Sequence, residues 1–114
     1  MKSDTIVADD KKLTVLFRVE PGCLGPEGKL HVEKFCDFAQ QELANTCANF
    51  VIWEIVPRHD KSLSELQYLI NNISLSNDQA TQYLRMFNMT RDEFGNMLQD
   101  KLAQLIDSFL EHTH

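Results

Sequence analysis

The chain has 114 residues, 43% of them hydrophobic and 25% charged, so it is long enough to bury one core and too apolar to remain disordered. Its net charge of −6 repels nucleic-acid phosphates and anionic lipid headgroups. No stretch approaches the roughly 20 consecutive apolar residues that cross a bilayer, and residues 1–12 lack the apolar run of a signal peptide. We therefore expect a cytoplasmic protein that binds neither nucleic acid nor membranes.

The cysteine content agrees with that compartment. Cys23, Cys36 and Cys47 are odd in number and do not have the spacing of a disulfide framework, which favours reduced thiols. They also lack the close paired spacing of structural zinc sites. We expect no metal site and no cofactor.

The first predicted element is a strand. Residues 1–12 are mostly polar and are predicted to be a flexible tail, followed by a single domain over residues 13–114. Within the tail, Ile6 and Val7 leave open a short edge strand. Residues 13–19 are short, apolar and rich in β-branched side chains, with charged residues before them and a proline-glycine pair after them. This pattern predicts a strand over residues 13–19.

A turn and a helix follow this strand. Residues 20–28 contain two prolines and three glycines, which predicts a turn region. Pro26 suits the first turn of a helix because it has no N–H to leave unpaired, and residues 45–49 are expected to end the helix. Apolar side chains then recur at steps of three and four residues, which predicts one buried stripe. The stripe consists of Val32, Phe35, Cys36, Ala39, Leu43 and Cys47.

The strand, the Cys23-Leu24-Gly25-Pro26 turn and the helix resemble the opening of the thioredoxin family. The chain departs from that family in two respects. Pro26 stands where the second cysteine of the Cys-x-x-Cys pair would lie, and everything after Ser62 is predicted to be helical where that family has antiparallel strands. The sequence is therefore not assigned to the family.

Residues 50–56 predict a second strand, which Pro57 ends. Two apolar strands separated by one helix indicate a βαβ unit with parallel strands. Their other faces carry Arg18 and Glu54, which are expected to pair across the sheet as a structural ion pair. Because a two-stranded sheet is marginal alone, the tail, a covering helix or a second subunit must complete it.

Three helices are predicted after the second strand, over residues 63–73, 77–88 and 91–111. Each is preceded by a capping box, in which two side chains three residues apart satisfy unpaired backbone N–H groups. The C-terminal helix has a wide apolar stripe that is expected to pack on the sheet, with a dimer seam as the alternative. The boxes pair Ser62 with Glu65, Ser76 with Gln79, and Thr90 with Glu93.

The predicted fold class is thus α/β or α+β: an N-terminal βαβ unit with a two-stranded, parallel sheet, then three helices. Dimerisation is one way to complete the sheet, since the same edge of two subunits can pair across a two-fold axis.

The best candidate site lies where the two strands end, because parallel strands finish at the same edge of a sheet. The first delivers Gly22, Cys23 and Gly25, and the second delivers Arg58 and His59. Two chemical hypotheses follow: Cys23 is an activated thiol near His59, or the turn binds a small anion with Arg58 as counter-charge. The structural alternative is that the turn only connects a strand to a helix.

No compact catalytic motif is present. The sequence therefore favours a small regulatory or protein-interaction module that forms a homodimer or binds another protein, with no catalysis of its own. A cysteine-dependent enzyme or redox sensor that uses Cys23 is the first alternative. A binding domain for small anions or other small ligands is the second.

Overall fold

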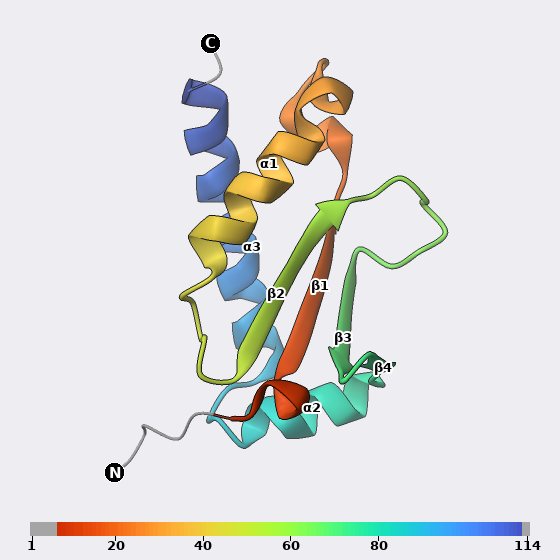
Figure 1. The fold of residues 1–114 in the computed structure, drawn as a ribbon, viewed down its shortest axis with the longest axis vertical. Coiled ribbons are helices and arrows are strands. Elements are labelled where there is room, and N and C mark those ends of the chain that lie inside the picture. The colour runs from red at the N-terminus through yellow and green to blue at the C-terminus, as the bar shows by residue number, and fades with distance from the viewer. Residues whose placement is uncertain (1–6, 113–114) are drawn as a thin grey trace.

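The computed structural model describes residues 7–112 and shows one mixed sheet with helices packed against it (Figure 1). None of the helices in this range is long and apolar enough to cross a membrane. The strands are β1 (Leu13–Val19), β2 (Val51–Pro57), β3 (Leu66–Ile70) and β4 (Ile73–Ser74), the helices are α1 (Gly28–Leu43), α2 (Asn77–Arg85) and α3 (Arg91–His112), and two short 3₁₀ helices are η1 (Asp9–Lys11) and η2 (Pro21–Leu24).

The sheet has four strands in the order β2-β1-β3-β4. β1 and β2 run parallel with α1 between them in the chain, and β3 and β4 are antiparallel additions. Both strands expected from the sequence are therefore present. The prediction of a two-stranded sheet is wrong. β3 and β4 complete the sheet within the chain, so no second subunit is needed for that.

The predicted helix over residues 63–73 is also wrong. The hydroxyl and backbone N–H of Ser62 donate to Asp60 Oδ1 at 2.6 and 3.0 Å, so Ser62 closes a turn instead of capping a helix. Residues 66–70 form β3, and Asn71 and Asn72 have φ values of 51° and 67°, the left-handed conformation of a two-residue hairpin turn. The sequence prediction had no antiparallel strand after Ser62, whereas the structure has two, β3 and β4.

The other two capping boxes are confirmed. Ser76 and Gln79 exchange hydrogen bonds at the start of α2, and Thr90 and Glu93 do so before α3. The apolar stripe of α3 is buried in the protein's own core, so the dimer-seam alternative is rejected. Its buried side chains are Phe94, Leu98, Leu102, Leu105 and Phe109.

The two long helices, α1 and α3, lie on the same side of the sheet (Figure 1). The Trp53 and Phe94 rings stack with centroids 5.8 Å apart, joining β2 to α3, and Phe35 meets Phe109 edge to face at 5.4 Å between the helices. Side chains of β2 alternate between buried and exposed. One face of the sheet therefore forms the core, and the other has no helix over it.

The expected ion pair between Arg18 and Glu54 does not form. The strand register places Glu54 beside Leu16 and Arg18 beside Val56. Arg18 turns instead toward the loop before β3, donating to the Ser64 carbonyl at 2.6 Å and to Gln67 Oε1 at 3.1 Å.

The outer edge of β2 is closed by a side chain of α1. Gln40 Nε2 donates to the Trp53 carbonyl at 2.6 Å, and Gln40 Oε1 accepts from the Ile55 N–H at 2.9 Å. One carboxamide thus satisfies two backbone groups that a neighbouring strand would otherwise bind. At the end of the strand, Pro57 has no N–H to offer.

Part of the predicted N-terminal tail is anchored. The Val7 N–H donates to the Asn49 carbonyl at 3.0 Å, and the Tyr83 hydroxyl donates to the Lys11 carbonyl at 2.9 Å. Ile6, the other residue of the candidate edge strand, lies outside the described residues.

Gly28 marks the closest approach between η2 and α1. A Cβ at Gly28 would lie 1.7 Å from the Pro21 carbonyl oxygen, whereas a Cβ at Gly22 would meet nothing within 4 Å. We expect Gly28→Ala to lower the free energy of unfolding by about 3 kcal/mol, because η2 must move off the helix. Gly22→Ala should change it by less than about 0.5 kcal/mol. Urea denaturation compares the two, and equal stabilities would contradict the close packing.

We expect Gln40→Ala to lower the free energy of unfolding by about 1–3 kcal/mol, because the Trp53 carbonyl and Ile55 N–H lose their partner in a part-buried place. Gln41→Ala, at the exposed neighbouring position of α1, is the matched control and should have little effect. If both variants unfold at the same denaturant concentration, the edge bond contributes nothing to stability.

Candidate functional site

The structure brings together most of the site predicted at the strand ends. Gly22, Gly25, Arg58 and His59 line one cavity of about 770 Å³, with Lys29 at its border. Two segments more than thirty residues apart in the chain thus face the same space, as the parallel pairing of β1 and β2 requires.

Cys23 lies elsewhere. Its side chain is exposed and lines a different cavity of about 230 Å³, together with Phe35 and Ala103. The reason is local: successive residues of a 3₁₀ helix are rotated by about 120°, so Gly22 and Gly25 share one side while Cys23 turns to another. Cys23 and His59 therefore line different cavities, and no hydrogen bond joins them within residues 7–112.

Basic side chains outnumber acidic ones around the first cavity, where Lys29, Arg58 and Lys61 stand against the single carboxylate of Glu20. Arg58 and Lys61 both approach the carboxylate of Glu20, at 3.5 and 3.4 Å. Arg58 Nη2 also donates to the Lys61 and Leu63 carbonyls at 3.2 and 3.1 Å. Arg58 therefore joins the loop after β2 to Glu20, which follows β1, while its Nε is buried without a hydrogen-bond partner among the described residues.

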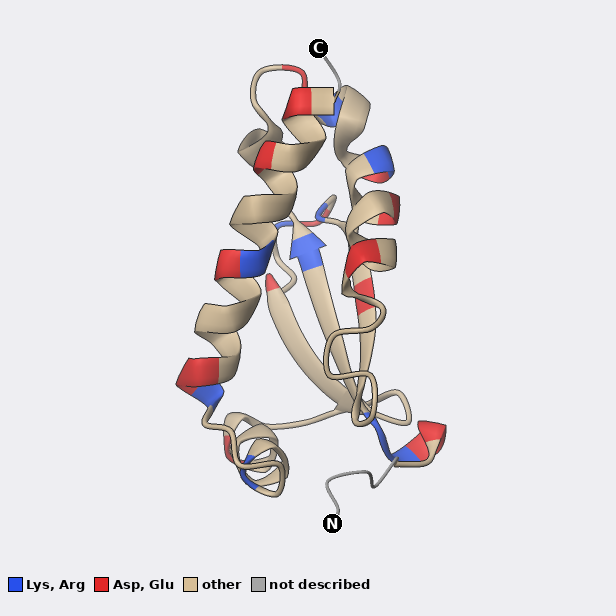
Figure 2. Ribbon diagram, turned by 90° about the vertical axis from the view of Figure 1, so that its left-hand side faces the viewer, with Lys and Arg blue, Asp and Glu red and all other residues tan. Residues whose placement is uncertain are grey.

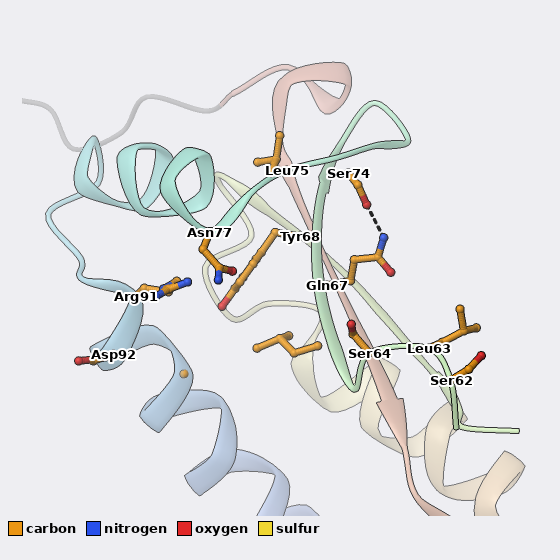
Figure 3. A pocket seen from close by; sticks show the side chains of 12 residues that line it. Ser62, Leu63, Ser64, Gln67, Tyr68, Ser74, Leu75, Asn77, Arg91 and Asp92 are labelled. Atoms are coloured by element: carbon orange, nitrogen blue, oxygen red, sulfur yellow. Dashed lines mark hydrogen bonds between the residues drawn. The ribbon is translucent and has the colours of Figure 1, made fainter. Parts of the chain in front are cut away.

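A further cavity, of about 660 Å³, was not predicted from the sequence, and we call it the second cavity (Figure 3). It lies between β3, the loop before it and the first residues of α2 and α3. Tyr68, Asn77 and Arg91 come from three separate elements and direct their polar ends toward one another. The mistaken helix over residues 63–73 hid this cavity; the Asn71-Asn72 turn was the signal that would have revealed β3.

The sheet face opposite the helices is the third feature. Its side chains are half-buried or exposed, and Ile52 is 38% exposed. The strand register places a mixed set of side chains on this face, which we call the open face. It consists of Thr14, Leu16, Arg18, Ile52, Glu54, Val56, Gln67, Leu69 and Ser74.

Residues 7–112 contain no group of three His, Cys, Asp or Glu side chains placed to hold a metal ion.

Comparison with known proteins gives no functional lead: no protein family matches the chain, and neither a curated protein nor a solved structure is significantly similar to it. Function must therefore be argued from the geometry.

The three thiols should differ sharply in reactivity. Burial raises the pKa of Cys36 to about 12, with Asp37 and Glu33 adding to the effect, and burial also raises the pKa of Cys47. With iodoacetamide near pH 8, we expect Cys23 to be alkylated first and Cys36 to stay unmodified until the protein unfolds, because only the thiolate reacts.

Peptide mass spectrometry measures these rates, with the protein in urea as the control in which all three thiols react alike. Alkylation of Cys36 as fast as Cys23 in the folded protein would contradict its burial.

Because the Cys36 thiol ionises near 9.0 when unfolded, its contribution to stability is complete below that pH and is lost as the pH rises toward 12.

Proposed function

We propose that this protein is a small interaction module that forms a homodimer through the open face of its sheet. The observation that carries the proposal is the one-sided packing of α1 and α3 on a sheet that includes a parallel strand pair, β1 and β2. Parallel strands are normally covered on both faces. A second layer over the open face would supply what the chain lacks.

The edges of the sheet are poor places for association. Gln40 occupies the outer edge of β2, and Pro57 ends that strand. At the other edge, β4 has two residues, too few for extended pairing with another chain. A second copy is therefore better accommodated on the open face than along either edge.

The distribution of charge supports the same face. α1 carries two basic and three acidic residues and α3 carries two and five, which gives these helices a formal charge of −4. The four strands carry only Arg18 and Glu54, a net charge of zero (Figure 2). Two copies of an acidic protein repel each other least when they approach through this face.

The open face is also complementary to itself. A two-fold axis brings the same patch of both subunits together. Each contact therefore occurs twice, once from each subunit. Apolar contact comes from Leu16, Ile52 and Leu69. Among the described residues, the Glu54 side chain has no ion pair or hydrogen bond, so it is free to meet Arg18 of the second copy.

Sedimentation equilibrium of the full chain tests the proposal. We expect a concentration-dependent dimer, and we expect Ile52→Glu to weaken it at least about tenfold, because the new carboxylates face each other across the axis. Ile52 is exposed enough that the monomer should still fold.

Leu30→Glu is the matched control, since Leu30 is 76% exposed on α1 and lies away from the open face. It should leave the dimer unchanged. A wild-type chain that remains monomeric at high concentration would refute the proposal, as would equal weakening by the two substitutions.

A further inference from the structure

Tyr68 presents an unpaired polar group inside the second cavity. The residue is only 7% exposed, and its ring packs 6.2 Å from that of Phe94. Its hydroxyl points toward Asn77 and Arg91 (Figure 3) and has no hydrogen-bond partner among residues 7–112. The ring is buried while the hydroxyl opens onto the cavity, so a ligand there can take up the bond that buried tyrosines usually make.

Arg91 supplies an uncompensated positive charge beside that hydroxyl. The guanidinium makes no ion pair or hydrogen bond within the described part of the chain. Burial raises the pKa of Tyr68, while the nearby charge of Arg91 acts in the opposite direction. Asp92 also lines the cavity, but its carboxylate points away from the Tyr68 hydroxyl (Figure 3).

The backbone adds to this positive potential, and the cap of Glu93 and the first-turn carboxylates of Asp78 and Asp92 offset part of it. Asn77 is the first residue of α2 and Arg91 is the first residue of α3, so both helices begin at the cavity. A helix N-terminus carries a partial positive charge and favours anions. It disfavours a cation, so Arg91 stands where it opposes the dipole of its own helix. That placement is unfavourable for stability and favourable for binding an anion.

We propose that Tyr68, Asn77 and Arg91 form a binding site for a small molecule that carries an oxyanion, either a carboxylate or a phosphate group. The Tyr68 hydroxyl and the Asn77 amide each donate one hydrogen bond, and the planar Arg91 guanidinium donates two in parallel. Leu63, Leu66 and Leu75 line the rest of the cavity and provide apolar contact for the remainder of the molecule. Tyr68, Asn77 and Arg91 lie outside the open face, whereas Gln67 and Ser74 line both the cavity and that face.

Nuclear magnetic resonance of the ¹⁵N-labelled full chain tests the site, with inorganic phosphate and acetate titrated separately at constant ionic strength. We expect at least one probe to shift the Arg91 Nε–H resonance and the amide resonances at the start of α2 and α3 until they saturate. Saturation by phosphate alone identifies the phosphate class, and saturation by acetate alone identifies the carboxylate class.

Arg91→Gln should weaken binding by at least about tenfold, because it removes a charge-assisted pair of hydrogen bonds. Tyr68→Phe, which removes only the hydroxyl, should weaken it by a smaller factor. Lys101→Gln removes the same charge from an exposed position of α3 and should leave binding unchanged. Arg91→Gln should not lower the unfolding temperature, since it relieves the helix dipole.

The site is refuted if neither probe gives saturating shifts in the wild-type chain. It is also refuted if Arg91→Gln and Lys101→Gln weaken binding equally, since the probes would then sense only the net charge of α3.

Discussion

The hydrogen bonds between Gln40 and the edge of β2 are the constraint on which the rest of the architecture depends. They fix α1 against the strand that follows it, and they use up the Trp53 carbonyl and the Ile55 N–H that a further strand would bind. The sheet can therefore grow only on the side of β1 that faces β3. Growth in that direction stops after β4, which has two residues. The chain thus completes its sheet without a partner, yet covers one face of it only.

That asymmetry gives the molecule two chemically different sides. The helical side buries the aromatic core, and α1 and α3 together carry a formal charge of −4, which discourages contact between two copies there. The open face carries one charge of each sign among four apolar and three uncharged polar side chains. Interface cores are depleted of charge in the same way. The polar groups of Tyr68, Asn77 and Arg91 lie at the start of α2 and α3, outside the open face, although Gln67 and Ser74 border both.

The sequence predicted β1, β2 and the α3 segment well because each has strong periodicity and a clear boundary: proline after both strands, and the Thr90–Glu93 box before α3. The prediction over residues 63–73 is wrong because Ser62 and Glu65 match the pattern of a helix-capping box without forming one. The contrary signal is the Asn71-Asn72 pair, whose left-handed conformation is compatible with a hairpin and not with a helix. The site at the strand ends could be predicted from parallel topology. The position of Cys23 could not, because the rotation of η2 is invisible in the spacing, and the second cavity needs β3 to exist.

Binding of a second copy to the open face can be tested by nuclear Overhauser contacts between methyl groups. In a sample that mixes labelled and unlabelled chains, only contacts between subunits are seen. We expect intermolecular contacts among Leu16, Ile52 and Leu69. Contacts confined to exposed helical side chains such as Leu30 and Met86, or no intermolecular contacts at millimolar concentration, would contradict it.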